Sequence, residues 1–200
     1  MSSKSRRLDS VCVYCASSNA ADPDFLSAAS VFGAILADAG LRLVYGGGGV
    51  GLMGACAKAA HDRGGRVLGV IPDFLTSHER PLKTVETVVV TSMHERKMKM
   101  FEEADAFAIL PGGIGTLEEV IELLSWRRLG LHAKPIAFLN AKGFWDPLFG
   151  IFDHILEQNL VPPEFRETWR SVDKVKDLLP ALRSMPTLAF MTPPGLEEMT

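Results

Sequence analysis

A glycine-rich turn followed by a carboxylate is the segment of this sequence whose residue types best suit chemistry. Residues 111–119 read Pro-Gly-Gly-Ile-Gly-Thr-Leu-Glu-Glu and directly follow the apolar run 106–110. This pattern predicts a strand, a turn and the start of a helix, where free backbone N–H groups and the helix dipole favour an anion such as phosphate. Glu119 would lie one helical turn further on, within reach of a sugar attached to that phosphate.

The other residues of the turn also have tasks in such a site. Three glycines permit positive φ and a close approach of the backbone to an oxyanion: Gly112, Gly113 and Gly115. Thr116 stands where the helix N-cap is expected. However, Thr116-x-x-Glu119 is also the spacing of a capping box, in which Glu119 would bond only to the backbone of the cap. The local pattern leaves catalysis and capping both open.

A second segment carries a cation where an apolar residue would be expected. Residues 92–97 read Ser-Met-His-Glu-Arg-Lys and begin a predicted helix, with capping-box spacing at Ser92 and Glu95. The core stripe of this helix would be Met93, Lys97, Met100, Phe101 and Ala104. Arg96 lies against that stripe, where a cation is costly unless it is paired, whereas Lys97 is expected to snorkel. An anionic ligand with a carboxylate at the same sheet edge would satisfy Arg96, and so would a purely structural partner.

A further glycine run, at 46–54, follows another predicted strand. Gly46, Gly48 and Gly51 fit the dinucleotide pattern G-x-G-x-x-G, but the acidic residue that should end the next strand is displaced to Asp73. No Gly-Lys-Ser/Thr follows either glycine turn, so the sequence lacks a P-loop. For this run, ligand contact and close packing of strand against helix are both open.

The elements that must position these residues alternate between strand-like and helical patterns. Strands are predicted at 11–15, 41–45, 66–71, 85–90, 106–110 and 134–139. Helices are predicted at 23–38, 92–103, 147–158 and 172–179. Two more follow the glycine turns: one runs from the 46–54 run to about residue 63, and the other from the 111–116 turn to about residue 129. Pro180 should end or kink the last helix, and 72–81 is predicted as a loop. This order predicts one α/β domain, Rossmann-like, with a mostly parallel sheet and helices on both faces. We assign 1–9 to a flexible N-terminus, 10–184 to the domain and 185–200 to a loose tail.

Ligands of open parallel sheets bind at the carboxyl ends of the strands. The predicted turns bring one set of residues to that edge: Ser17, Ser18, Gly46, Gly47, Gly48, Gly49, Glu79, Arg96, Thr116 and Glu119. No histidine with a nucleophilic serine or cysteine shows supporting spacing. What remains is a carboxylate–arginine site beside a phosphate cradle.

Composition limits the partners. The 200 residues carry a formal net charge of -3, which provides no basic field for nucleic acid, and no apolar run approaches the ~20 residues of a membrane span. The five histidines lack zinc-site spacing, so no metal is expected.

Cys12 and Cys15 would point to opposite faces of one strand, which favours buried thiols over redox or zinc chemistry. The odd count of three cysteines suits a reducing compartment, and we expect a cytoplasmic protein.

The two motifs together resemble those of the Lonely Guy family, the cytokinin riboside 5'-monophosphate phosphoribohydrolases once labelled lysine decarboxylases. The family patterns P-G-G-x-G-T-x-x-E and M-H-x-R-K are intact at 111–119 and 93–97, and the likeness extends from Val11 through about Leu160. The resemblance implies hydrolysis of the N-glycosidic bond of adenosine 5'-monophosphates, including N6-modified ones, to free base and ribose 5-phosphate. It implies no cofactor.

By the same resemblance, Arg96 and Glu119 are the catalytic pair. The substrate-binding positions would be Gly46, Gly47, Gly48, Glu79, Met93, Arg96, Lys97, Gly112, Gly113, Ile114, Gly115, Thr116 and Glu119. The family also implies a homodimer, with a nucleoside monophosphate as its small-molecule partner. Ile114 stands where an aromatic residue is common in relatives, and Arg127-Arg128 replaces a more neutral pair. These departures leave the base preference and the details of the dimer face open.

Two other functions remain open. A nucleotide-binding or carrier protein would share the fold and the phosphate turn without hydrolysing its ligand. A lysine decarboxylase would need pyridoxal phosphate on a lysine, and no lysine here has a convincing setting for that cofactor.

Overall fold

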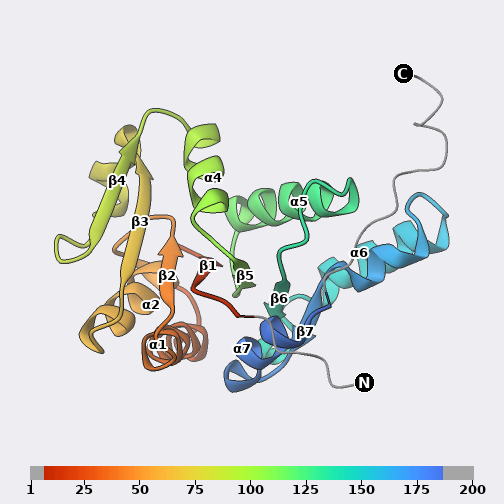
Figure 1. Ribbon diagram of the computed structural model, residues 1–200, viewed down its shortest axis with the longest axis horizontal. Coiled ribbons are helices and arrows are strands. Elements are labelled where there is room, and N and C mark those ends of the chain that lie inside the picture. The colour runs from red at the N-terminus through yellow and green to blue at the C-terminus, as the bar shows by residue number, and fades with distance from the viewer. Residues whose placement is uncertain (1–6, 187–200) are drawn as a thin grey trace.

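The computed structural model describes residues 7–186, and their centre is one sheet of seven parallel strands in the order β4-β3-β2-β1-β5-β6-β7 (Figure 1). The strands are β1 (Ser10–Tyr14), β2 (Arg42–Tyr45), β3 (Val67–Pro72), β4 (Glu86–Val90), β5 (Ala106–Ile109), β6 (Ile136–Leu139) and β7 (Arg170–Val172). The chain builds outward from β1 to β4 and then returns to pair β5 with the other side of β1, where Val13 lies opposite Ala108. Such a reversal of direction opens a crevice at the carboxyl ends of the two central strands.

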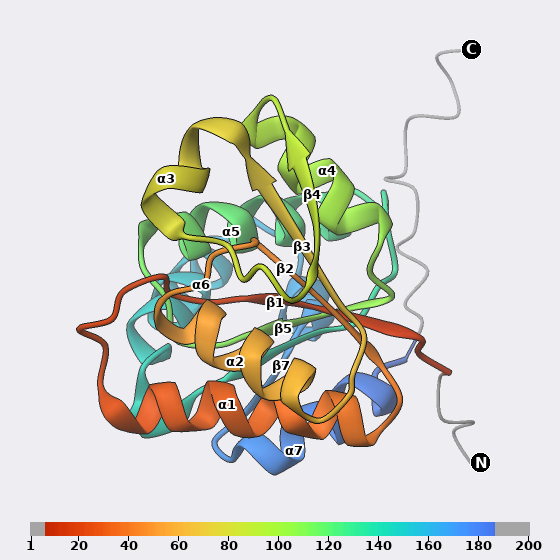
Figure 2. The same cartoon turned by 90° about the vertical axis from the view of Figure 1, so that its left-hand side faces the viewer.

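Helices cover both faces of the sheet (Figure 2), so the predicted α/β class and the layer arrangement are confirmed. One face carries α1 (Pro23–Asp38), α2 (Gly51–Asp62) and α7 (Val175–Ser184), and the other carries α4 (Met93–Glu102), α5 (Ile114–Arg128) and α6 (Asp146–Glu157). Alternate strand side chains enter the two cores, and Cys12 and Cys15 are therefore buried on opposite faces. The prediction of buried strand thiols is confirmed.

The last strand and helix differ from the prediction. Residues 170–172 form β7 beside β6, and α7 begins at Val175 and continues through Pro180 to Ser184. A proline inside a helix removes one hydrogen bond and costs about 3 kcal/mol. Packing of the apolar face of α7 against the sheet offsets that cost, through buried Leu178, Leu179 and Leu182.

A short helix replaces the loop predicted at 72–81. After a 3-10 turn at Asp73–Leu75, α3 (Thr76–Glu79) ends at Arg80, whose φ of 47° is left-handed. The prediction was wrong because the segment has no apolar periodicity of its own. The turn brings Glu79 to the sheet edge at which β1 and β5 end.

The packed fold begins before residue 10. Leu8 is buried in the core, and the Asp9 N–H donates to the Asp105 carboxylate. The rest of the expected flexible segment, 1–6, and most of the expected tail, 187–200, lie outside the described residues. Within 7–186, no helix is long and apolar enough to cross a membrane, and no three His, Cys, Asp or Glu side chains are grouped to hold a metal ion.

Candidate functional site

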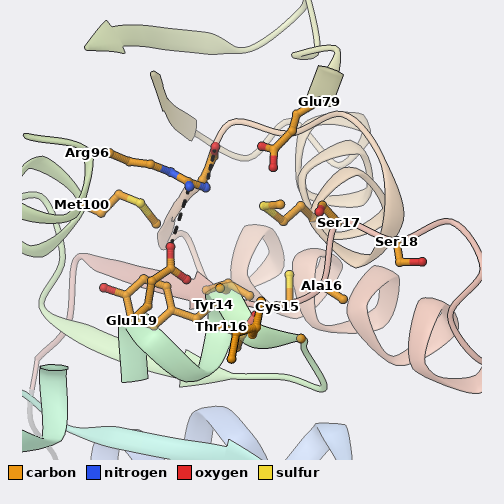
Figure 3. A pocket seen from close by; sticks show the side chains of 16 residues that line it. Tyr14, Cys15, Ala16, Ser17, Ser18, Glu79, Arg96, Met100, Thr116 and Glu119 are labelled. Atoms are coloured by element: carbon orange, nitrogen blue, oxygen red, sulfur yellow. Dashed lines mark hydrogen bonds and ion pairs between the residues drawn. The ribbon is translucent and has the colours of Figure 1, made fainter. Parts of the chain in front are cut away.

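The crevice between β1 and β5 holds a pocket of about 250 Å³ (Figure 3). Its walls come from β1 and the turn after it, from the turns after β2 and β5, and from α2, α3, α4 and α5. The lining residues are Val13, Tyr14, Cys15, Ala16, Ser17, Ser18, Gly46, Met53, Glu79, Arg96, Met100, Gly113, Ile114, Gly115, Thr116 and Glu119. They include every residue predicted to face one cleft except the glycines at 47–49.

Arg96 and Glu119 meet inside this pocket, with only 6% and 8% of their surfaces exposed. Arg96 Nη1 lies 3.9 Å from Glu119 Oε1, and Nη2 donates a 3.1 Å hydrogen bond to the Gly46 carbonyl oxygen (Figure 3). A Cβ at position 46 would lie 1.9 Å from Nη2, so only glycine lets the guanidinium approach the backbone this closely. The expectation that Arg96 is buried and paired with a carboxylate at this sheet edge is confirmed.

Burial controls the ionisation of Glu119. Loss of hydration raises the pKa of this carboxyl to about 7, although the neighbouring Arg96 guanidinium acts in the opposite direction. The like charges of Glu118 and Glu79 add to the rise. Glu119 therefore changes its charge near neutral pH, as catalytic carboxyl groups often do.

Helix α5 begins earlier than predicted. Gly113, with φ −93° and ψ −154°, is the N-cap, so Thr116 is the third residue of the helix and its assignment as N-cap is wrong. The positive φ that glycine permits is not used at Gly112, Gly113 or Gly115, because the extended Gly113 already makes the turn. Within 7–186 the Glu119 carboxylate makes no hydrogen bond to the backbone. The capping-box interpretation of Glu119 therefore fails.

Glu79 faces the same pocket from the opposite wall (Figure 3). Its Oε2 is buried and has no hydrogen-bond partner among the described residues. Burial raises the pKa of Glu79, and the Arg96 guanidinium opposes that rise. Because a buried acceptor without a partner is costly, a donor on a ligand, such as a sugar hydroxyl, would satisfy it.

Some residues carried over from the family do not line the pocket: Gly47, Gly48, Met93, Lys97 and Gly112. A Cβ at Gly48 would lie 3.1 Å from Glu79 Oε2, and one at Gly112 would lie 2.2 Å from Thr116 Oγ1. Met93 Sδ accepts a weak 3.8 Å contact from Arg96 Nη1. Within the 46–49 run, the close fit of Gly48 against Glu79 favours the packing interpretation, whereas Gly46 lines the pocket.

Sequence reasoning missed several residues of the pocket. Tyr14 ends β1 and Cys15 directly follows it, and the side chains of Met53 and Met100 come from α2 and α4. Knowledge of the strand order would have identified the first two, because the strand at which the order reverses ends in the crevice. The methionines carry no such signal, since methionine spacing on a helix is typical of a core residue.

Comparison with known proteins identifies the family. Residues 53–182 match the family described as "Possible lysine decarboxylase". A protein from Oryza sativa subsp. japonica named "Probable cytokinin riboside 5'-monophosphate phosphoribohydrolase" is 43% identical over 173 residues, which are 86% of this chain and 75% of the relative. A cytokinin riboside 5'-monophosphate phosphoribohydrolase from Arabidopsis thaliana is 41% identical over 174 residues, 86% of this chain and 80% of the relative.

The fold is shared more widely. The structure of the molybdenum cofactor binding protein from Rippkaea orientalis covers 90% of this chain and 98% of its own, with a TM-score of 0.67 and 23% identity. Identity at that level shows a common Rossmann-like fold and nothing about the ligand. The family match and the sequence relatives together show that this chain belongs to the Lonely Guy family of cytokinin riboside 5'-monophosphate phosphoribohydrolases.

Proposed function

We propose that this chain hydrolyses the N-glycosidic bond of adenosine 5'-monophosphates, including N6-modified ones, to free base and ribose 5-phosphate. The observation that carries the proposal is the buried Arg96–Glu119 pair, in a pocket at the start of α5. The named activity of the sequence relatives supports it.

The phosphate is assigned to the N-terminus of α5. Free N–H groups and the positive end of the helix dipole attract an anion there, and four residues of this helix start line the pocket: Gly113, Ile114, Gly115 and Thr116. The phosphate is remote from the bond that breaks, so its binding energy serves to position the ribose.

Glu119 is assigned to the anomeric carbon. Breaking an N-riboside bond builds positive charge there, as glycoside hydrolysis does. The ionised carboxylate stabilises that charge and orients the attacking water, while Arg96 holds the carboxylate or the ribose. The unpartnered oxygen of Glu79 is assigned to a ribose hydroxyl.

A substrate panel tests the proposal. The protein is incubated with AMP and isopentenyladenosine monophosphate, each beside its unphosphorylated nucleoside, and free base is measured by chromatography. We expect base release from the monophosphates and little from the nucleosides. Tight binding without base release would favour a nucleotide carrier, and a bound pyridoxal chromophore would favour the decarboxylase.

The proposed assembly is a homodimer. Large apolar side chains are exposed along α5 and just after it: Ile114, Ile121, Leu129 and Leu131. Such a surface is typical of an association site. Light scattering should report twice the chain mass of 21.8 kDa. The three free, buried thiols fit the proposed cytoplasmic location, which cell fractionation would test.

A further inference from the structure

Lys97 is held between two carboxylates of the neighbouring helix, beside both members of the buried pair. Its Nζ lies 2.5 Å from Glu118 Oε1 and 2.9 Å from Glu122 Oε2, and its side chain is 13% exposed. Lys97 follows Arg96 on α4, and Glu118 precedes Glu119 on α5. Helices α4 and α5 are neighbours (Figure 1), and this ion triad joins them at the positions next to the pair.

Arg96 is anchored to the Gly46 carbonyl oxygen, but no hydrogen bond joins it to Glu119. The distance of 3.9 Å between Arg96 Nη1 and Glu119 Oε1 is too long for a hydrogen bond, and Arg96 Nε has no partner among the described residues. Another contact between the helices, the edge-to-face packing of Phe101 on Trp126, lies toward the far end of α4. At the pocket end, the ion triad links α4 to α5.

We propose that Lys97 is a positioning residue: held by Glu118 and Glu122, it sets the separation of Arg96 and Glu119 in the reacting complex. A network with a largely buried cation fixes its geometry better than an exposed pair does. Burial acts to lower the pKa of Lys97, but the two carboxylates outweigh it and raise that pKa, so the ammonium stays charged. The inference rests on the proposed hydrolase activity.

Two variants separate positioning from direct contact of Lys97 with the substrate phosphate. Lys97→Met removes the cation, whereas Glu118→Gln/Glu122→Gln keeps the cation but removes its partners. We expect both variants to lower kcat by about 10- to 100-fold, because a small misplacement of catalytic groups is costly, with KM changed much less. A raised KM in Lys97→Met alone, with a normal double variant, would mean that Lys97 binds the substrate and would overturn the proposal.

The pH profile separates geometry from charge. Arg96 and Lys97 lower the pKa of Glu119, whereas Glu118 raises it. Lys97→Met removes one cation and moves the other away, so it should raise the pH midpoint of activity. In the double variant, loss of Glu118 and the wider separation from Arg96 oppose each other, so the midpoint should move less although kcat still falls. Lys97→Arg should restore most of kcat. Lys99→Met is the matched control, because Lys99 makes an ion pair with Glu103, at 2.8 Å, on the same helix.

Crystal structures of the same variants give a readout that is independent of activity. In Lys97→Met and in the double variant, the Arg96–Glu119 separation should exceed 3.9 Å, and in Lys99→Met it should not. An unchanged Arg96–Glu119 separation, or variants with a lowered Tm but normal kcat, would mean that the triad stabilises the fold without positioning the pair. If the wild-type protein releases no base, the proposed function fails, whereas the separation in these structures still tests the triad.

Discussion

Glu119 is buried beside a guanidinium without a hydrogen bond to it, an arrangement that leaves its oxygens available to a ligand. Glu119→Gln preserves the shape of this side chain and removes its charge. We expect turnover of AMP to fall by ~100-fold or more, the scale of acid–base assistance, because no carboxylate then attends the anomeric carbon. Affinity for ribose 5-phosphate, measured by calorimetry, should stay nearly unchanged, since the phosphate is proposed to bind at the start of α5 and not at Glu119.

The control for this change is Glu157→Gln, which removes an exposed carboxylate from α6. Its turnover should match that of the wild-type protein. Near-normal turnover in Glu119→Gln would remove this residue from the chemistry and leave Arg96 with a structural partner only.

The raised pKa of Glu119, about 7, predicts the pH dependence of activity. The ionised carboxylate is the form that stabilises positive charge, so kcat should rise with pH and reach half of its maximum near pH 7. The second ionisation of the substrate phosphate, at about pH 6, should cause a separate change in the pH profile of activity, and Glu119→Gln should still show that change. Activity that falls as pH rises through 7 would instead assign Glu119 as the acid that protonates the leaving base.

At the scale of elements, short-range patterns predicted most of the fold. Six strands were identified because each contains a run of apolar residues, whereas β7 reads Arg-Ser-Val and is too short and too polar to be recognised from the sequence. Ser92 caps α4 as predicted, with its Oγ accepting the Glu95 N–H at 3.1 Å, but the Glu95 carboxylate bonds to the Thr91 N–H, not to Ser92.

Local sequence patterns also identified only part of the site. Arg96 and Glu119 were identified because each lies in a contiguous motif, whereas Tyr14 and Met53 reach the pocket only through the strand order and the helix packing. Those features depend on contacts between segments far apart in the chain, which local spacing does not encode. For Thr116, the extended turn at Gly113 overrode a good N-cap residue.

The start of α5 predicts a contrast between two glycines. A methyl group at Gly112 would meet Thr116 Oγ1 at 2.2 Å and Thr116 Cβ at 2.5 Å, whereas one at Gly115 would meet nothing within 4 Å. Gly112→Ala should therefore destabilise the protein by about 1–3 kcal/mol through overpacking. Gly115→Ala should stabilise it by about 0.5–1 kcal/mol, because alanine favours the helix. Urea unfolding measures both, and equal values for the two would contradict this account of the turn.

At the scale of the whole molecule, five segments distant in sequence converge on one pocket because the strand order reverses between β1 and β5. That convergence buries several ionisable groups, which a fold selected for stability alone would avoid. The site should therefore reduce the free energy of unfolding, and by an amount that depends on pH.

Glu119 makes this cost measurable. Its pKa is about 7 in the folded protein and about 4.3 in an unfolded chain, so the unfolded chain releases its proton first as pH rises. The contribution of Glu119 to the free energy of unfolding does not change below about pH 4. It falls between the two pKa values and is lower by about 4 kcal/mol above pH 7. Glu119→Gln removes this dependence, although it leaves Arg96 without its carboxylate at every pH. We therefore expect the free energy of unfolding of Glu119→Gln, measured in urea, to increase relative to that of the wild-type protein from pH 5 to pH 8. Glu157→Gln should show no such trend. A constant difference across that range would mean that Glu119 is already ionised at pH 5 in the folded state, and the pH dependence proposed for catalysis would fail with it.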